Sequence, residues 1–140
     1  MKTLITPNLL KFTLTTVILT IIFRIGLSTS ITSKMIIAVV ISALVYAIFM
    51  WFNGFYFGKK EYEYLPICDI GFRFHLSTFL AHNLISVLWF VFGFESPYEN
   101  IYTIYTTASI WSVFLIFHLV YFLYVRKSSI KNLDKEDLFE

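Results

Sequence analysis

The chain has 140 residues, of which 58% are hydrophobic and only 14% charged, and its mean hydropathy is +0.74. In a soluble domain about a quarter of the residues are charged, so this composition excludes an ordinary soluble domain and predicts an all-α, polytopic membrane protein. The net charge of +2 provides no basic surface for nucleic acid. The single cysteine, Cys68, excludes an internal disulfide and a CxxC redox pair.

The first two membrane spans are expected at residues 9–27 and 35–57. A helix needs about 20 apolar residues to cross a hydrocarbon core of roughly 30 Å, and both segments meet this length. Lys11 and Arg24 lie near the two ends of the first span. Their side chains are therefore expected to extend toward the membrane interface.

A polar loop, residues 58–71, follows the second span, and Pro66 within it is expected to break any helix. The third and fourth spans are expected at residues 72–94 and 101–125. A tight turn around Pro97 connects them.

The distribution of Lys and Arg predicts the orientation. Arg24 and Lys34 fall on one side of the four spans, and the remaining nine Lys and Arg residues fall on the other. By the positive-inside rule, both termini and the polar loop are cytoplasmic. The expected architecture is one membrane domain over residues 1–140, a four-helix bundle with short loops and a cytoplasmic tail at residues 126–140.

The third span differs from the others because it carries His75, His82 and Asn83 at membrane depth. Since the turn to the fourth span is short, the two spans must be antiparallel neighbours. His75 then lies within about one turn of the level of His118, and Asn83 lies near Trp111. The two histidines of the third span are seven residues apart, as are Trp111 and His118, so each pair shares a helix face. The sequence predicts two polar layers, His75 with His118 nearer the cytoplasm, and His82, Asn83 and Trp111 deeper.

The pattern FxFHLxxFxxxN, from Phe72 to Asn83, is followed by a tight turn and by WxxxxxxH, from Trp111 to His118. Together these motifs resemble the two-transmembrane-helix domain family over roughly residues 69–125. The resemblance implies an antiparallel helical hairpin. In bacteria this hairpin occurs either as a separate small membrane protein or fused to LytTR-type histidine kinases. It implies no established ligand or reaction. It does imply a location in a bacterial inner membrane.

His75 and His118 can be interpreted in two ways. Imidazoles from facing helices can ligate haem b or a metal ion, or they can hydrogen-bond across the hairpin. Directly adjacent helices leave little room for a haem plane, which favours hydrogen bonding, so no cofactor is predicted. His82 and Asn83 are expected to hydrogen-bond between helices, with a proton or ion path as the alternative. Trp111 is expected to pack beside them.

The loop after the second span and its borders carry mixed charges. A loop of this kind is expected to be solvated, and its acidic and aromatic residues could also form a docking surface. Arg73 can pair with Asp69, four residues before it, or with lipid phosphate. The charged residues of this region are Lys59, Lys60, Glu61, Glu63, Asp69 and Arg73.

The sequence contains no complete catalytic constellation, so we expect a non-enzymatic protein without catalytic residues. The first hypothesis is a sensory, anchoring or assembly module that uses the hairpin of the third and fourth spans and the cytoplasmic loop. Its expected partners are lipid and either another protein or further copies of the chain. One alternative is a haem- or metal-binding membrane protein that uses His75 and His118. A second is an oligomeric pore or membrane-perturbing defence effector lined by Asn53, His82 and Asn83.

Overall fold

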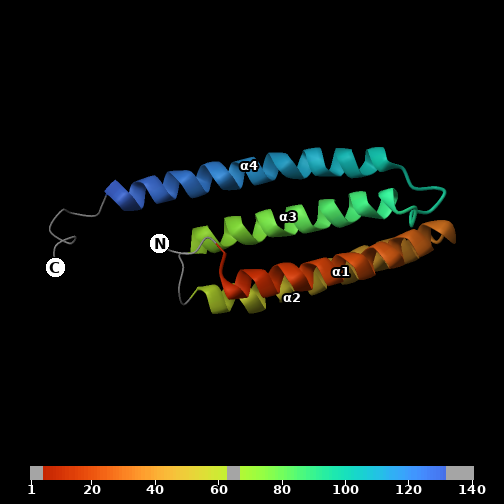
Figure 1. The fold of residues 1–140 in the computed structure, drawn as a ribbon, viewed down its shortest axis with the longest axis horizontal. Helices are drawn as coiled ribbons and strands as arrows, with labels where there is room; N and C mark the ends of the chain where they lie inside the picture. The colour runs from red at the N-terminus through yellow and green to blue at the C-terminus, as the bar shows by residue number, and fades with distance from the viewer. Residues whose placement is uncertain (1–4, 63–66, 132–140) are drawn as a thin grey trace.

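The computed structural model of the protein describes residues 5–62 and 67–131. These residues form four helices joined by short connections (Figure 1), and each helix is long and apolar enough to cross a membrane. The predicted all-α class with four spans is therefore confirmed. The helices are α1 (Pro7–Thr32), α2 (Ile36–Glu61), α3 (Ile67–Val91) and α4 (Ile101–Lys131).

Helix α1 extends beyond the predicted span at both ends. Thr6 caps its first turn by accepting a hydrogen bond from the Leu9 amide, and Pro7 occupies the first helical position, where the missing amide hydrogen costs nothing. At the other end, the hydroxyls of Ser30 and Thr32 donate to carbonyls four residues back. These bonds satisfy the polar side chains within the helix, so a serine- and threonine-rich stretch remains helical.

The connection between α2 and α3 is shorter than the predicted loop. Residues 58–61 and 67–71, expected in that loop, are helical. Lys59 and Lys60 lie in the last turn of α2, where positive charge is favourable beside the helix C-terminus. Pro66 and Glu63, both assigned to the loop, lie outside the described residues.

Helix α3 ends at Val91, before the predicted residue 94. Gly93 has a φ angle of 70°, a left-handed conformation that glycine adopts without steric cost. Its amide donates to the carbonyl of Phe90, as is usual where a helix ends. The Asn100 side chain accepts a hydrogen bond from the Tyr102 amide and caps the start of α4.

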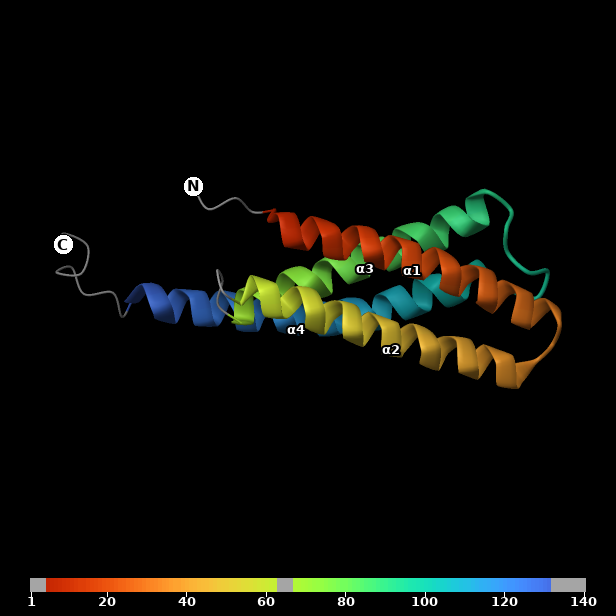
Figure 2. The ribbon, with the colours of Figure 1, turned by 90° about the horizontal axis from the view of Figure 1, so that it is seen from below.

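The helices are arranged so that α4 lies at one edge. The α1–α2 hairpin packs on α3 mainly through α1, and α4 contacts α3 alone among the described helices. Figure 1 shows α3 between α4 and the α1–α2 pair, and Figures 1 and 2 both show the start of α1 and the end of α4 toward the same end of the molecule. The small buried core lies near that end, between the start of α1 and the start of α3. It consists of Leu9, Phe12, Ile70 and Phe74, with Met50 and Phe57 packed against it.

Helix α4 is consequently almost entirely exposed outside its contact with α3. None of the residues in its most hydrophobic window is buried, in contrast to 22% for α1. Apart from Ser112, the half-buried residues of α4 form one stripe. The residues of this stripe are spaced alternately three and four positions apart. His118 lies on the same stripe, between Leu115 and Phe122, but is exposed. The half-buried members are Ile101, Ile104, Ala108, Trp111, Leu115, Phe122 and Val125.

Candidate functional site

The seam between α3 and α4 brings His75, Trp111 and His118 together. The indole Nε1–H of Trp111 donates to Nε2 of His75, and Nδ1 of His75 lies 2.6 Å from Nδ1 of His118. The two imidazole rings are nearly perpendicular, at 86°, with centroids 4.7 Å apart. Next to this group, the Phe72 ring stacks on the Phe122 ring, which extends the seam toward the end of α4.

The partners in this group fix the positions of the protons. An indole nitrogen can only donate, so Nε2 of His75 must accept, and a neutral His75 then carries its proton on Nδ1. That Nδ1–H donates to Nδ1 of His118, which leaves the His118 proton on Nε2. The hydrogen bonds therefore run in one direction, from Trp111 through His75 to His118. They end in an N–H group of His118, which is exposed.

A second directed chain joins α1, α2 and α3. The Thr20 hydroxyl donates to the carbonyl of Thr16 at 2.8 Å, so Thr20 must accept from the Tyr46 hydroxyl, 3.0 Å away. Since Tyr46 has used its only proton, it accepts from Nδ1–H of His82 at 3.2 Å. His82 is thereby held to α2, with its Nε2 unprotonated. The interhelical role expected for His82 is present, but its hydrogen-bonded partner lies on α2.

The two chains meet at Trp111 without joining. The Trp111 ring lies 5.9 Å from the His75 ring and 5.5 Å from the His82 ring, measured between centroids. Because the indole N–H has no acceptor capacity, no proton can pass through it from one histidine to the other. This geometry disfavours a continuous proton path. It also places Trp111 between the two predicted layers, in hydrogen-bond contact with the layer of His75.

Among the described residues, the Asn83 side chain makes no hydrogen bond to another helix. Its side-chain amide donates to the carbonyl of Phe79, one turn earlier in α3, at 2.7 Å. The asparagine side chain is short enough to hydrogen-bond the backbone of its own helix. The interhelical hydrogen bond expected for Asn83 is therefore absent among the described residues, and its side chain stabilises α3 locally.

The distance between His75 and His118 bears on the haem and metal hypothesis. Two imidazole nitrogens that ligate one ion on opposite sides are separated by about 4 Å, twice the usual metal–nitrogen distance of about 2 Å. The observed 2.6 Å between the Nδ1 atoms is a hydrogen-bond distance. Both nitrogens of His75 are already engaged. The residues as they lie do not fit a bis-histidine site.

A buried ion pair, which sequence reasoning missed, ties α1 to the α3–α4 turn. Arg24 donates to Glu99 at 2.6 Å, and the side chains are 3% and 6% exposed. The guanidinium also lies over the rings of Trp89 and Phe90, at 5.8 and 5.7 Å from their centroids. Arg24, which was expected to extend toward the membrane interface, reaches an acidic partner in the α3–α4 turn and is buried there. An arginine inside a span needs such a partner, and that need was the available signal.

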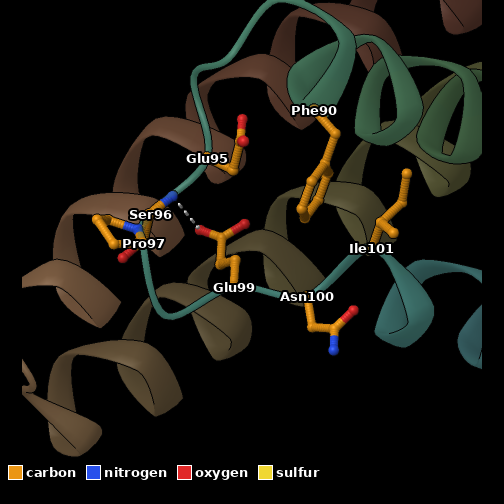
Figure 3. A pocket seen from close by; sticks show the side chains of 7 residues that line it. All are labelled: Phe90, Glu95, Ser96, Pro97, Glu99, Asn100 and Ile101. Carbon is orange, nitrogen blue, oxygen red and sulfur yellow. Dashed lines mark hydrogen bonds between the residues drawn. The ribbon is translucent and has the colours of Figure 1, made fainter.

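Beside this ion pair, the turn borders an open pocket of about 460 Å³ (Figure 3). The backbone amide of Ser96 donates to Glu99 at 3.4 Å, which holds the Glu99 carboxylate against the turn. One buried oxygen of Glu95 has no hydrogen-bond partner among the described residues. The lining combines acidic and polar residues with apolar ones and consists of Phe90, Glu95, Ser96, Pro97, Glu99, Asn100 and Ile101.

At the opposite end, Glu61 contradicts the expectation of a solvated charged loop. Its side chain is 1% exposed, and it accepts a hydrogen bond from the Thr6 hydroxyl at the start of α1. Glu61 is buried because α2 continues to this residue and turns it toward α1. Lys59 and Lys60 are exposed, as expected. Arg73 pairs with Asp69 at 3.2 Å, in the spacing that the sequence indicated.

Asn53, proposed to line a pore, faces α1 in the interior of the protein. Its amide donates to the Thr16 hydroxyl oxygen at 3.1 Å and to the Phe12 carbonyl at 3.4 Å. It is 8% exposed. Within one chain, Asn53 therefore joins α1 to α2 rather than facing an aqueous channel.

Comparison of the chain with protein-family models, with curated proteins and with solved structures gave no significant match. The resemblance of residues 69–125 to the two-transmembrane-helix family therefore remains a prediction from its motifs.

Proposed function

We propose that this protein is a non-enzymatic assembly module of the bacterial inner membrane, in which the α3–α4 hairpin presents α4 to a membrane-embedded protein partner. Helices α1, α2 and α3 are the scaffold, and α4 is the helix that binds. In this proposal the end that carries the start of α1 and the end of α4 faces the cytoplasm, because most Lys and Arg residues of the described helices lie in the parts of the helices nearest that end.

The observation that carries the proposal is the one-sided attachment of α4. This helix contacts α3 alone among the described helices, and its most hydrophobic window contains no buried residue. A helix that only had to complete a bundle would be expected to touch two neighbours, as α1 does by contacting both α2 and α3. The exposed faces of α4 are free to pack against a further helix.

The attachment of α4 is nevertheless specific. Three hydrogen-bonding side chains, Trp111, His75 and His118, hold α4 to α3 in one register. Interhelical hydrogen bonds in membranes are worth about 0.6 kcal/mol each on average, so the group fixes the register more than it adds to stability. A partner would therefore meet a helix face whose position is set.

Photo-crosslinking from two matched phenylalanines tests the proposal. Phe117 on α4 and Phe52 on α2 are 67% and 57% exposed, and each can be replaced by the photoreactive analogue p-benzoylphenylalanine. In native membranes we expect Phe117→p-benzoylphenylalanine to give one adduct of defined mass with one protein, identified by mass spectrometry. The Phe52 position should give only lipid adducts. Lipid adducts alone from both positions would refute an assembly role for α4.

A further inference from the structure

The N–H group at the end of the Trp111–His75–His118 chain has no acceptor among the described residues. The direction of the chain leaves the His118 proton on Nε2, and the residue is exposed. Each neutral imidazole nitrogen that carries a proton is a donor. A donor left without an acceptor in hydrocarbon costs several kcal/mol. The acceptor must therefore lie outside the described residues of this copy.

The depth of His118 limits what that acceptor can be. The candidate membrane span of α4 is Ile101–Val125, and His118 lies five residues from its midpoint, which corresponds to about 8 Å along the helix at 1.5 Å per residue. The hydrocarbon half-thickness is about 15 Å. The oxygen atoms of lipid head groups lie outside this layer, so a protein group at the same depth is the suitable acceptor.

Tyr121 offers such a group on the same side of α4. It lies one turn after His118, is 58% exposed, and its hydroxyl has no hydrogen bond among the described residues. Residues three apart are neighbours on a helix surface, and side chains of a helix lean toward its N-terminus. The Tyr121 ring therefore leans back toward the level of His118.

One face of α4 thus carries both a donor, His118 Nε2–H, and an acceptor, the Tyr121 oxygen. A two-fold interface is self-complementary: residue i of one copy meets residue j of the other, and j meets i. A second copy of this chain would satisfy both groups twice, at equal depth. An unrelated helix would need a matching pair of its own. The same exposed face includes Phe114 and Phe117 for packing, at 61% and 67% exposure.

We propose that the partner of α4 is a second copy of this chain, held by two reciprocal hydrogen bonds from His118 Nε2–H to the Tyr121 hydroxyl of the other copy. This inference rests on the proposed assembly role of α4 and adds the identity of the partner. Trp111 is a positioning residue in it, because its indole N–H sets the tautomer of His75 and, through it, that of His118.

The dimerisation equilibrium of the full-length protein in lipid bilayers, measured by Förster transfer between labelled copies, tests the inference. We expect the wild type to dimerise and Tyr121→Phe, which removes only two hydroxyl groups per dimer, to raise the dissociation constant about 10-fold. Tyr124→Phe is the matched control, since Tyr124 is 73% exposed and lies on the same helix. It should change the constant less than twofold.

Nitrogen-15 NMR of histidine-labelled protein supplies a readout that loss of packing would not reproduce. We expect His118 as the neutral Nε2–H tautomer and His75 as the Nδ1–H tautomer. Trp111→Phe, which frees Nε2 of His75, should mix the tautomers of both residues. His118 protonated on Nδ1 in the wild type would overturn the inference.

The two proposals fail separately. A monomeric wild type, or equal dissociation constants for Tyr121→Phe and Tyr124→Phe, would overturn the reciprocal dimer. If the Phe117 position still crosslinked to one other protein, the assembly role would stand with a different partner. A monomer that gives only lipid adducts would end both.

Discussion

The buried pair of Arg24 and Glu99 gives the most direct test of how this fold is held together. Glu99→Gln changes the shape of the side chain very little and removes its charge. Arg24 would then be a cation with 3% exposure, facing a neutral amide. The reason to expect a large effect is that the guanidinium has no route to water without displacing the turn after α3.

The magnitude follows from the distance and the burial. At 2.6 Å and an effective dielectric constant of about 20, the attraction between two unit charges is about 6 kcal/mol. Part of this offsets the cost of removing both groups from water. Removing one partner of a buried pair typically costs about 3–5 kcal/mol, and we expect Glu99→Gln to lie in that range. Replacing both partners, in Arg24→Met with Glu99→Gln, should cost less than Glu99→Gln alone.

Unfolding of the purified protein in mild detergent by increasing mole fractions of dodecyl sulfate, followed by circular dichroism, measures these free energies. Glu95→Gln is the matched control, because Glu95 lies in the same turn and forms no ion pair with any of the described residues. We expect it to change the free energy of unfolding by less than about 1 kcal/mol. Equal effects of Glu99→Gln and Glu95→Gln would show that the pair contributes no net stability and would refute this reasoning.

Three further substitutions test other parts of the fold by the same unfolding assay. Asn53→Leu removes the donor to Thr16 and should destabilise by about 0.5–2 kcal/mol; no loss would mean that the α1–α2 bond is dispensable. Gly93→Ala should cost about 1 kcal/mol because of the φ angle of 70°, whereas Gly54→Ala, in the middle of α2 with open space around it, should stabilise by about 0.5 kcal/mol. If the two glycine substitutions changed the free energy of unfolding in the same direction, this interpretation of Gly93 would be wrong. Glu61→Gln keeps an acceptor for the Thr6 hydroxyl and should be more stable than Glu61→Leu by about 1 kcal/mol; the reverse order would contradict the role of Glu61 as an acceptor.

The number of helices could be read from the sequence, but their ends could not. Apolar runs of spanning length are a strong signal, because inside the hydrocarbon core the backbone must satisfy its own hydrogen bonds, which a helix does within one segment. The ends depend on weaker local balances. The hydroxyls of Ser30 and Thr32 bond their own backbone and extend α1, and Lys59 and Lys60 favour the last turn of α2 through its dipole. Neither effect is visible in hydrophobicity.

The approach of His75 to His118 followed from the short turn and the rise per residue, which together set the levels of antiparallel helices. The partners of Arg24 and Asn83 could not be found in this way. Arg24 meets Glu99 only because the turn folds over α1, and Asn83 prefers a carbonyl of its own helix. Level along a helix is set by counting residues, whereas the direction of a side chain depends on which partner is nearest in three dimensions.

The pairing of Arg24 with Glu99 also constrains the order of events during synthesis. The two residues are 75 positions apart, so α1 leaves the ribosome well before its counter-ion exists. Until Glu99 is made, burying Arg24 in lipid would cost several kcal/mol, and we expect α1 to sit shallowly, with the guanidinium near the interface. Completion of the α3–α4 turn then lets α1 settle to its final depth. The α3–α4 turn thereby determines when α1 reaches its final depth.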